Sequence, residues 1–245
     1  MKNLFKNLML VAVAAMAFTA CQKDNEDVNK VDKVTVIEFT ADLNATRSGF
    51  TGEKGETGYQ SVWNGGEKVT VYVGDVSANN NDTLAITTED GVHGRFTAEF
   101  SSSLPTEGDI EAYVPAAGWA DVWIDGGYVM TPQIPGTQTP SDNSVDPAAH
   151  LLKSVQAYTG GVAASANLVF EHGVAYAKMT LNLGTVVAFE NIESVVVDID
   201  GNQRYTLLPS EDLTLPTFWF ACKACEPEAM TVTITDKSDV TYVKE

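Results

Sequence analysis

The 245-residue sequence has few basic residues, few histidines and few cysteines, and each shortage narrows the range of functions. Lysine and arginine number 15 against 33 acidic residues, so the formal net charge is −18. A chain without a basic patch cannot release counterions from a nucleic-acid backbone, which argues against nucleic acid as a partner. The negative charge favours solubility and repulsion between monomers instead.

Catalytic motifs are also missing. The three histidines, His93, His150 and His172, stand in unrelated contexts, and no G-x-S-x-G elbow, H-E-x-x-H helix, P-loop or dinucleotide glycine motif occurs. A glycosidase-like carboxylate pair stays open, although most acidic residues fall on turns or on the polar side of strands. We therefore expect no enzyme, with no catalytic residue, no metal site and no cofactor.

Cysteine is limited to Cys21 and to a C-x-x-C pair, Cys222 and Cys225 in "FACKAC". Such a pair can be redox-active, half of a zinc site or a tight disulfide in an exported protein. No second pair or histidine-rich partner motif accompanies it, which disfavours zinc. We interpret the two cysteines as structural, and a disulfide between them outside the cytoplasm stays open.

Only one long apolar run is present, from Leu8 to Phe18, and it follows Lys2 and Lys6. It is too short for a membrane span, which needs roughly 20 apolar residues, and it has the length of a secretory h-region. The run leads through small residues into Cys21, an arrangement that resembles a bacterial lipobox. We predict a lipoprotein signal peptide over residues 1–20 and lipidation of Cys21, with an ordinary cleaved signal peptide as the alternative.

Residues 21–33 are polar and acidic, without apolar periodicity, and we interpret them as a solvated tether. Loss of the signal peptide removes two lysines and no acidic residue, which takes the net charge from −18 to −20. Lipid chains on Cys21 would hold the tether at a membrane surface.

The rest of the chain alternates apolar and polar residues with period 2, the pattern of antiparallel strands with one buried face. Turn signals separate these segments, and "DIDGNQ" predicts a hairpin with its tip near Gly201 and Asn202. One helix is predicted, in "DPAAHLLKSVQAY", with Asp146 as its N-cap and Pro147 at the first helical position.

We expect an all-β protein with two β-sandwich domains in tandem, over residues 34–155 and 156–245. The boundary follows a loop rich in Pro, Thr and Ser at residues 131–147. Aromatic residues that could form a sugar-binding face are Trp63, Trp119, Trp123 and Tyr128, although packing explains them more simply.

The order of these features resembles the fimbrillin family of Bacteroidota, the lipoprotein subunits of type V pili. The resemblance rests on the lipobox, the acidic tether, the strand "VIEFTADL", "NATRSGF", "WNGGEKVTVYVGD" and "LVFEHGVAYAKMTLNL". It implies two transthyretin-like antiparallel β-sandwich domains and a lipid-anchored, surface-exposed position in the outer membrane or a fimbria. Its partners would be other pilus subunits, joined by strand exchange.

The family also implies removal of the N-terminal strand by an arginine-specific protease. Of the three arginines, Arg47 in "NATRSG" is the best site, with the cut between Arg47 and Ser48, because Arg95 and Arg204 fall beside or within expected strands. The strand at residues 34–43 would then be a placeholder for a strand from the next subunit. A permanent strand is the alternative.

The ending "SDVTYVKE" departs from the family, because it lacks the further strands expected there. A truncated C-terminal domain would suit a tip or accessory subunit better than a shaft pilin. The competing hypothesis is a non-polymerising outer-membrane lipoprotein that binds a glycan or a host protein through its sandwich loops.

Overall fold

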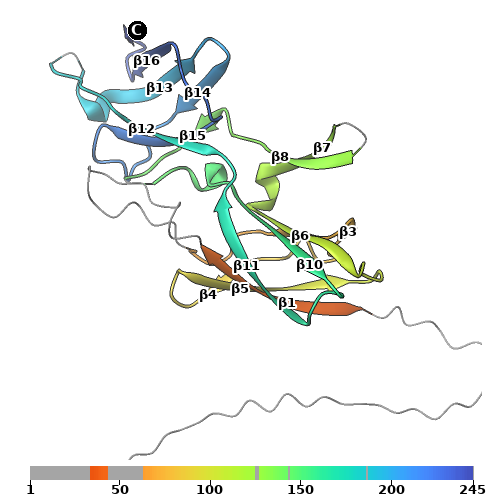
Figure 1. Ribbon diagram of the computed structural model, residues 1–245. Coiled ribbons are helices and arrows are strands. Elements are labelled where there is room, and N and C mark those ends of the chain that lie inside the picture. The colour runs from red at the N-terminus through yellow and green to blue at the C-terminus, as the bar shows by residue number, and fades with distance from the viewer. Residues whose placement is uncertain (1–33, 44–62, 125–126, 143, 186, 245) are drawn as a thin grey trace, which may run out of the picture. The chain divides into compact units, whose positions relative to one another are not determined.

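The computed structural model describes residues 34–43, 63–124, 127–142, 144–185 and 187–244, and side chains at 123–128 are not described. Strands dominate, as predicted, and the helical elements of these residues are short 3-10 turns: η1 (Ala116–Gly118), η2 (Pro147–Ala149) and η3 (Phe189–Asn191). None of the described residues forms a helix long and apolar enough to cross a bilayer. The prediction of an all-β protein is confirmed (Figure 1).

The first sheet has eight strands in the order β3-β2-β6-β10-β11-β1-β5-β4. Only two residue pairs join β10 to β11, Leu152 with His172 and Lys153 with Glu171, so the sheet opens there into two layers. The strands are β1 (Thr35–Leu43), β2 (Thr70–Val73), β3 (Val76–Ser77), β4 (Thr87–Thr88), β5 (His93–Phe100), β6 (Glu107–Val114), β10 (Leu152–Thr159) and β11 (Ser165–His172).

One hydrophobic core fills the space between the two layers. Every second residue of β5 is buried, from Gly94 to Phe100, and the intervening residues are exposed. Strands from the other layer contribute Val71, Val73, Ile110 and Ala112 to the same cluster. The two-residue period of the sequence therefore produces a β-sandwich, because each layer hides one face against the other.

The second half of the chain builds a separate core between two further sheets. A five-stranded sheet has the order β17-β16-β13-β14-β9, and a two-stranded sheet pairs β12 with β15. The strands are β9 (Thr137–Gln138), β12 (Ala175–Thr180), β13 (Ile192–Ile199), β14 (Gln203–Leu207), β15 (Thr217–Cys222), β16 (Met230–Asp236) and β17 (Thr241–Lys244).

The hairpin predicted around Gly201 and Asn202 is confirmed as the connection between β13 and β14. Asp200 and Gly201 both have positive φ, 55° and 68°, and the Asn202 amide donates to the Ile199 carbonyl at 3.2 Å. Two consecutive left-handed residues define a type I′ turn, which matches the twist of the strands it joins.

The predicted helix after Asp146 is wrong beyond its first turn. Asp146 caps η2 by accepting a hydrogen bond from the Ala148 amide, and Pro147 occupies the first position as expected. The chain then turns into strand β10, which pairs with β6 along its whole length. Sheet pairing outweighs the local helix signal here, because Leu152 and Ser154 face a buried layer.

Some strands belong to a different sheet from the one that their place in the sequence predicted. The boundary placed between residues 155 and 156 falls inside β10, and the first sheet continues to His172 at the end of β11. In the opposite direction, β9 pairs in parallel with β14 of the second core. The loop at residues 131–147 therefore contributes a strand instead of only separating the domains.

Gln138 of β9 replaces a missing strand beside β15. Its side chain is fully buried, its Nε2 donates to the Ala221 carbonyl at 2.9 Å, and its Oε1 accepts from the Ala221 amide at 2.8 Å. The side-chain amide thus forms the same pair of bonds that a neighbouring backbone would form.

We predict that Gln138→Leu lowers the free energy of unfolding by roughly 2–4 kcal/mol, because the Ala221 amide and carbonyl would stay buried without partners. Urea denaturation measures the loss. Gln156→Leu, at an exposed position of β10, is the matched control and should change stability little. Equal stability of both variants would contradict this role of Gln138.

Candidate functional site: the position of strand β1

Strand β1 is the first strand of the described chain, yet it lies inside the sheet with a neighbour on each side (Figure 1). It pairs antiparallel with β5 from Thr35 to Asp42, and parallel with β11 from Glu38 to Leu43. The other strand pairs of this sheet are antiparallel. No described strand precedes β1, so its departure would leave the chain order of the other described strands unchanged.

The inner face of β1 is completely buried. Ile37, Phe39 and Ala41 are at most 1% exposed, whereas Val36 on the outer face is 52% exposed. Phe39 stacks on Phe96 of β5, with ring centroids 5.1 Å apart. Burial of each large apolar side chain contributes roughly 1.5–3 kcal/mol, so β1 supplies a substantial part of the stability of the first core.

Trp63 closes the core at the end of β1. Its indole Nε1–H donates to the Ala41 carbonyl at 2.9 Å, and its ring meets Phe170 edge-on at 5.4 Å. Ala41 is opposite Gly94 of β5. A Cβ atom on Gly94 would lie 2.6 Å from Ile86 and 3.2 Å from Trp63, so these side chains already fill the space beside Ala41.

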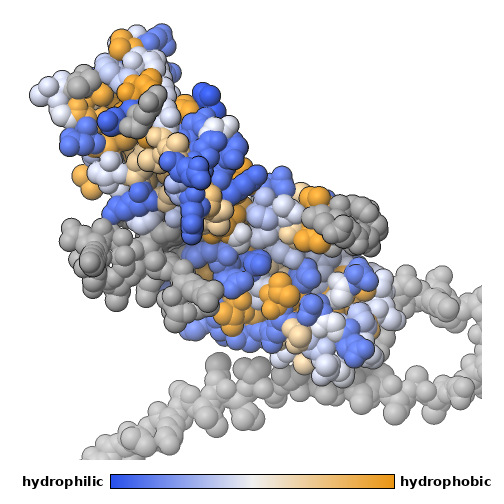
Figure 2. Space-filling view, turned by 45° about the horizontal axis from the view of Figure 1, so that its top comes forward, coloured by the Kyte–Doolittle hydropathy of each residue, from blue (hydrophilic) through white to orange (hydrophobic). Residues whose placement is uncertain are grey.

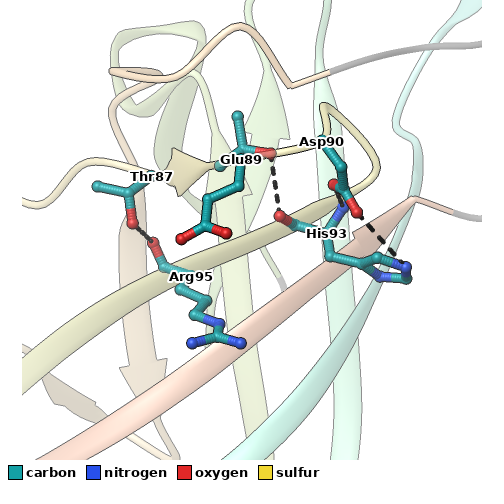
Figure 3. A pocket seen from close by; sticks show the side chains of 6 residues that line it. Thr87, Glu89, Asp90, His93 and Arg95 are labelled. Carbon is teal, nitrogen blue, oxygen red and sulfur yellow. Dashed lines mark hydrogen bonds and ion pairs between the residues drawn. The ribbon is translucent and has the colours of Figure 1, made fainter. Parts of the chain in front are cut away.

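Polar contacts hold the outer face of β1. His93 Nδ1 lies 2.7 Å from Asp42 Oδ1, and Thr40 hydrogen-bonds to Asn167 of β11. The hydrogen bond to Asp42 and the charge of Asp90 raise the pKa of His93. Figure 3 shows Asp90 facing the His93 ring, at 4.0 Å between Oδ2 and Nε2. A protonated His93 thus binds the last part of β1 to β5.

A cavity of about 290 Å³ lies beside this contact, lined by Thr87, Thr88, Glu89, Asp90, His93 and Arg95 (Figure 3). Its base is β5 and its wall is the turn between β4 and β5. Acidic and basic groups are mixed in its lining, so it has no clear preference for the charge of a ligand.

A second cavity, of about 400 Å³, is bordered by the hairpin of β7 (Trp119–Ile124) and β8 (Gly127–Pro132). Its lining combines aromatic rings, carboxylates and apolar groups: Tyr72, Gly74, Asp75, Glu111, Tyr113, Asp121, Val129 and Met130. Tyr113 donates to Glu111 at 2.5 Å, and burial together with this bond raises the Tyr113 pKa. The cavity can offer stacking surfaces and hydrogen-bond acceptors to a ligand.

Two of the aromatic residues considered for a sugar-binding face, Trp63 and Trp119, are buried and offer no exposed ring face. Trp119 is 7% exposed and packs on Tyr113 at 4.8 Å, and Trp63 is buried beneath β1. The side chains of Trp123 and Tyr128 lie outside the described part. On the face in Figure 2, hydrophilic residues separate the exposed hydrophobic ones into small groups.

His150 and His172 meet each other and Tyr176 in a partly buried cluster, with the two histidine rings 5.7 Å apart. Burial, with a smaller effect of His172, lowers the pKa of His150 to about 4. Packing therefore explains these histidines. In the parts of the chain that are described, no group of three or more His, Cys, Asp or Glu could hold a metal.

The remaining predicted site residues divide into two groups. Cys21, Arg47 and Ser48 lie outside the described residues. Cys222 and Cys225 are free thiols, the first buried at the end of β15 and the second exposed, so the structure contains no disulfide between them. Burial raises the pKa of the Cys222 thiol, with a smaller effect of Cys225, which makes it a poor nucleophile.

Sequence reasoning missed Gly94 and the role of Trp63. Gly94 had a usable signal, because a glycine at a buried position of an alternating strand often marks the close approach of another group. Trp63 had no such signal in the sequence, since its contacts with Ala41 and Phe170 join distant segments.

Comparison with known proteins adds no relative: no family model, no curated protein and no solved structure matches the chain.

We predict that the contact between His93 and Asp42 makes the local stability of β1 in the sheet depend on pH. The pKa of His93 is higher in the folded protein than its unfolded value of about 6.5. The stabilisation of β1 by protonated His93 is therefore complete below about pH 6.5 and is lost as the pH rises through the folded-state pKa. Hydrogen exchange of β1 amides should therefore be faster at about pH 8.5 than at about pH 5.5, after correction for intrinsic rates.

Asp42→Asn is the control for this effect, because it keeps the shape of the side chain and removes its charge. The pH-dependent difference in corrected exchange rates should shrink in this variant. A difference that persists unchanged would assign the effect to another group.

Proposed function

We propose that this chain is a surface-exposed, fimbrillin-like lipoprotein, a structural or accessory subunit of a type V pilus that assembles by donor-strand exchange and serves adhesion. Cys21 would carry the lipid anchor to the outer membrane, and residues 21–33 would be the tether. The observation that supports the proposal best is the position of β1, an N-terminal strand that completes both the sheet and the core between β5 and β11.

Removal of β1 would leave two unpaired strand edges and an apolar slot in place of Ile37, Phe39 and Ala41. Unpaired backbone groups and exposed apolar surface both favour the addition of another strand. The space that β1 occupies between β5 and β11 is called the β1 slot below. An incoming strand would restore the hydrogen bonds and the burial that β1 now provides.

Cleavage would change the balance between β1 and a competing strand. An intact chain holds β1 beside its slot at an effective concentration in the millimolar range or above. A cut after Arg47 turns β1 into a separate peptide, so dilution or a better-fitting strand can replace it. The core contacts of β1 delay its loss until a replacement is present.

An accessory or tip position suits the chain better than a shaft position. The edge strand β17 is short, and its exposed Val243 and Lys244 contribute little to the second core. The strand offers few apolar groups with which to fill the slot of another subunit. β17 would therefore be a poor donor strand, which suits a receiving subunit.

We predict that an arginine-specific protease cuts folded residues 22–245 once, after Arg47. Arg95 and Arg204 lie in paired strands β5 and β14, which cannot extend into a protease without local unfolding. Intact mass after limited digestion identifies the cut, and unheated SDS gels report oligomers. A receiving subunit should give a clean cut without oligomers, and a self-assembling pilin should give SDS-resistant ones.

Arg47→Gln is the matched control and should remain intact under the same conditions. A wild-type chain that stays uncut, or that is cut first at Arg95 or Arg204, would contradict the proposal.

A second candidate function is ligand binding at the cavity of about 400 Å³ beside the hairpin of β7 and β8. Tyr72 and Tyr113 offer ring faces, and Glu111 and Asp121 offer acceptors for sugar hydroxyl groups. The protein would then be an outer-membrane lipoprotein that binds a glycan or a host protein and does not polymerise.

We predict for this alternative that Asp121→Asn weakens binding on a glycan array by about tenfold, the effect of one lost hydrogen bond to a charged group. Asp109→Asn, at an exposed position of β6 outside the cavity lining, is the control and should bind normally. Absence of any array signal for the wild type would remove the glycan form of this function.

A further inference from the structure

We propose that the β1 slot selects its incoming strand by the pattern large apolar–x–aromatic–x–small, with polar groups at the positions after the aromatic and after the small residue. This inference rests on the proposed function, and it specifies the partner: a strand of another polypeptide with this pattern. The three inward positions of the slot are those that Ile37, Phe39 and Ala41 now fill.

The first two positions require large side chains. Ile37 is opposite Ala98, a small residue that leaves room for a bulky neighbour. Phe39 lies between Phe96 on β5 and Ala166 on β11, and the two phenylalanine rings stack with an interplanar angle of 22°. An aliphatic residue in the place of Phe39 would lose this stacking, and a small one would leave a cavity.

The third position is the most restrictive. Ala41 is fully buried between Gly94 and Leu168, and the indole of Trp63 binds its carbonyl. The space over Gly94 is already filled, because a Cβ there would lie within 3.2 Å of Trp63 and 2.6 Å of Ile86. We infer that a longer side chain on the neighbouring Ala41 would compete for the same space with Trp63, which also packs on Phe170. The slot therefore requires alanine, glycine or a residue of similar size there.

The outward positions add a polar requirement. Thr40 bonds to Asn167 on one neighbouring strand, and Asp42 bonds to His93 on the other. An incoming strand with a hydroxyl and a carboxylate at these two positions would recover both contacts. These bonds are exposed, so they contribute less than the inner face does.

The chain's own edge strand does not satisfy the pattern. In β17, Tyr242 would supply the aromatic residue, but Lys244 would then fall at the small position. Among the described strands besides β1, only β15 carries the inward part of the pattern, as Phe218, Phe220 and Cys222. It lacks the polar group after the aromatic residue, because Ala221 stands there, and its inward residues are buried in the second core. The described strands of a second copy, apart from its β1, would therefore fill the slot poorly.

The test uses residues 22–245 cut after Arg47 and an excess of synthetic peptides. The reference peptide has the sequence of residues 34–43, VTVIEFTADL, with a fluorescent label. Capture is measured by native mass spectrometry and by fluorescence anisotropy. Three altered peptides are compared with it: Ala41→Leu and Phe39→Ala at inward positions, and Val36→Leu as the matched control at an outward position.

We expect the reference and Val36→Leu peptides to be captured equally, and the Ala41→Leu peptide to bind at least about tenfold more weakly because it overpacks the third position. The Phe39→Ala peptide should bind more weakly still, since it leaves a cavity. In a Trp63→Phe protein, which has more room at the third position, the difference between the reference and Ala41→Leu peptides should become smaller.

The outcomes separate the selection rule from the proposed function. Equal capture of the reference and Ala41→Leu peptides would overturn the rule and leave strand exchange intact. No capture of any peptide, the reference included, would overturn strand exchange and the rule with it.

Discussion

The first core depends on the pairing of β1 with β5 and β11, because this strand completes a layer that the other described strands leave open. Without it, β5 and β11 would lack a common neighbour, and Phe96 and Leu168 would lose the side chains that cover them. The burial of Ile37 and Phe39 alone contributes roughly 3–6 kcal/mol. That is a large share of the roughly 5–15 kcal/mol by which a typical domain is stable. Loss of β1 without a replacement strand would therefore destabilise the first core strongly.

The contacts of Trp63, His93 and Asn167 all serve to keep β1 between its two neighbouring strands. Trp63 follows the undescribed residues 44–62 and returns to bind the Ala41 carbonyl, so the chain closes over the end of the strand that it has just left. His93 and Asn167 bind the outer face of β1 from its two neighbours. Both contacts are exposed, whereas the side chains of the inner face are almost completely buried. The contacts that fix which side chains fit are thus on the buried inner face, and this arrangement supports the proposal of an exchangeable strand.

The sequence predicted the class of the fold and the strand at residues 34–43 because period-2 alternation reports directly which face of a strand is buried. The sequence pattern wrongly predicted a longer helix at β10. The Asp146 cap and Pro147 do start a helical turn, but pairing with β6 then draws the chain into a strand. It could not predict the parallel register between β1 and β11, or the contact of Trp63 with Ala41. These arise from segments far apart in the chain, and local patterns carry no information about them. The domain boundary was obscured for the same reason, since β9 and β11 each join strands distant in sequence.

Replacement of β1 in the slot by another polypeptide can be measured on the protein recovered from the cells that produce it. Intact mass gives the first residue of the recovered chain. A photo-crosslinker placed at Thr97, which faces Glu38 across the strand pair, identifies the occupant of the slot by the peptide attached to it. If β1 is exchanged, we expect a chain that begins at Ser48, with a segment of another polypeptide crosslinked at Thr97. A chain that keeps residues 34–43, crosslinked to Thr97 of the same molecule, would contradict it.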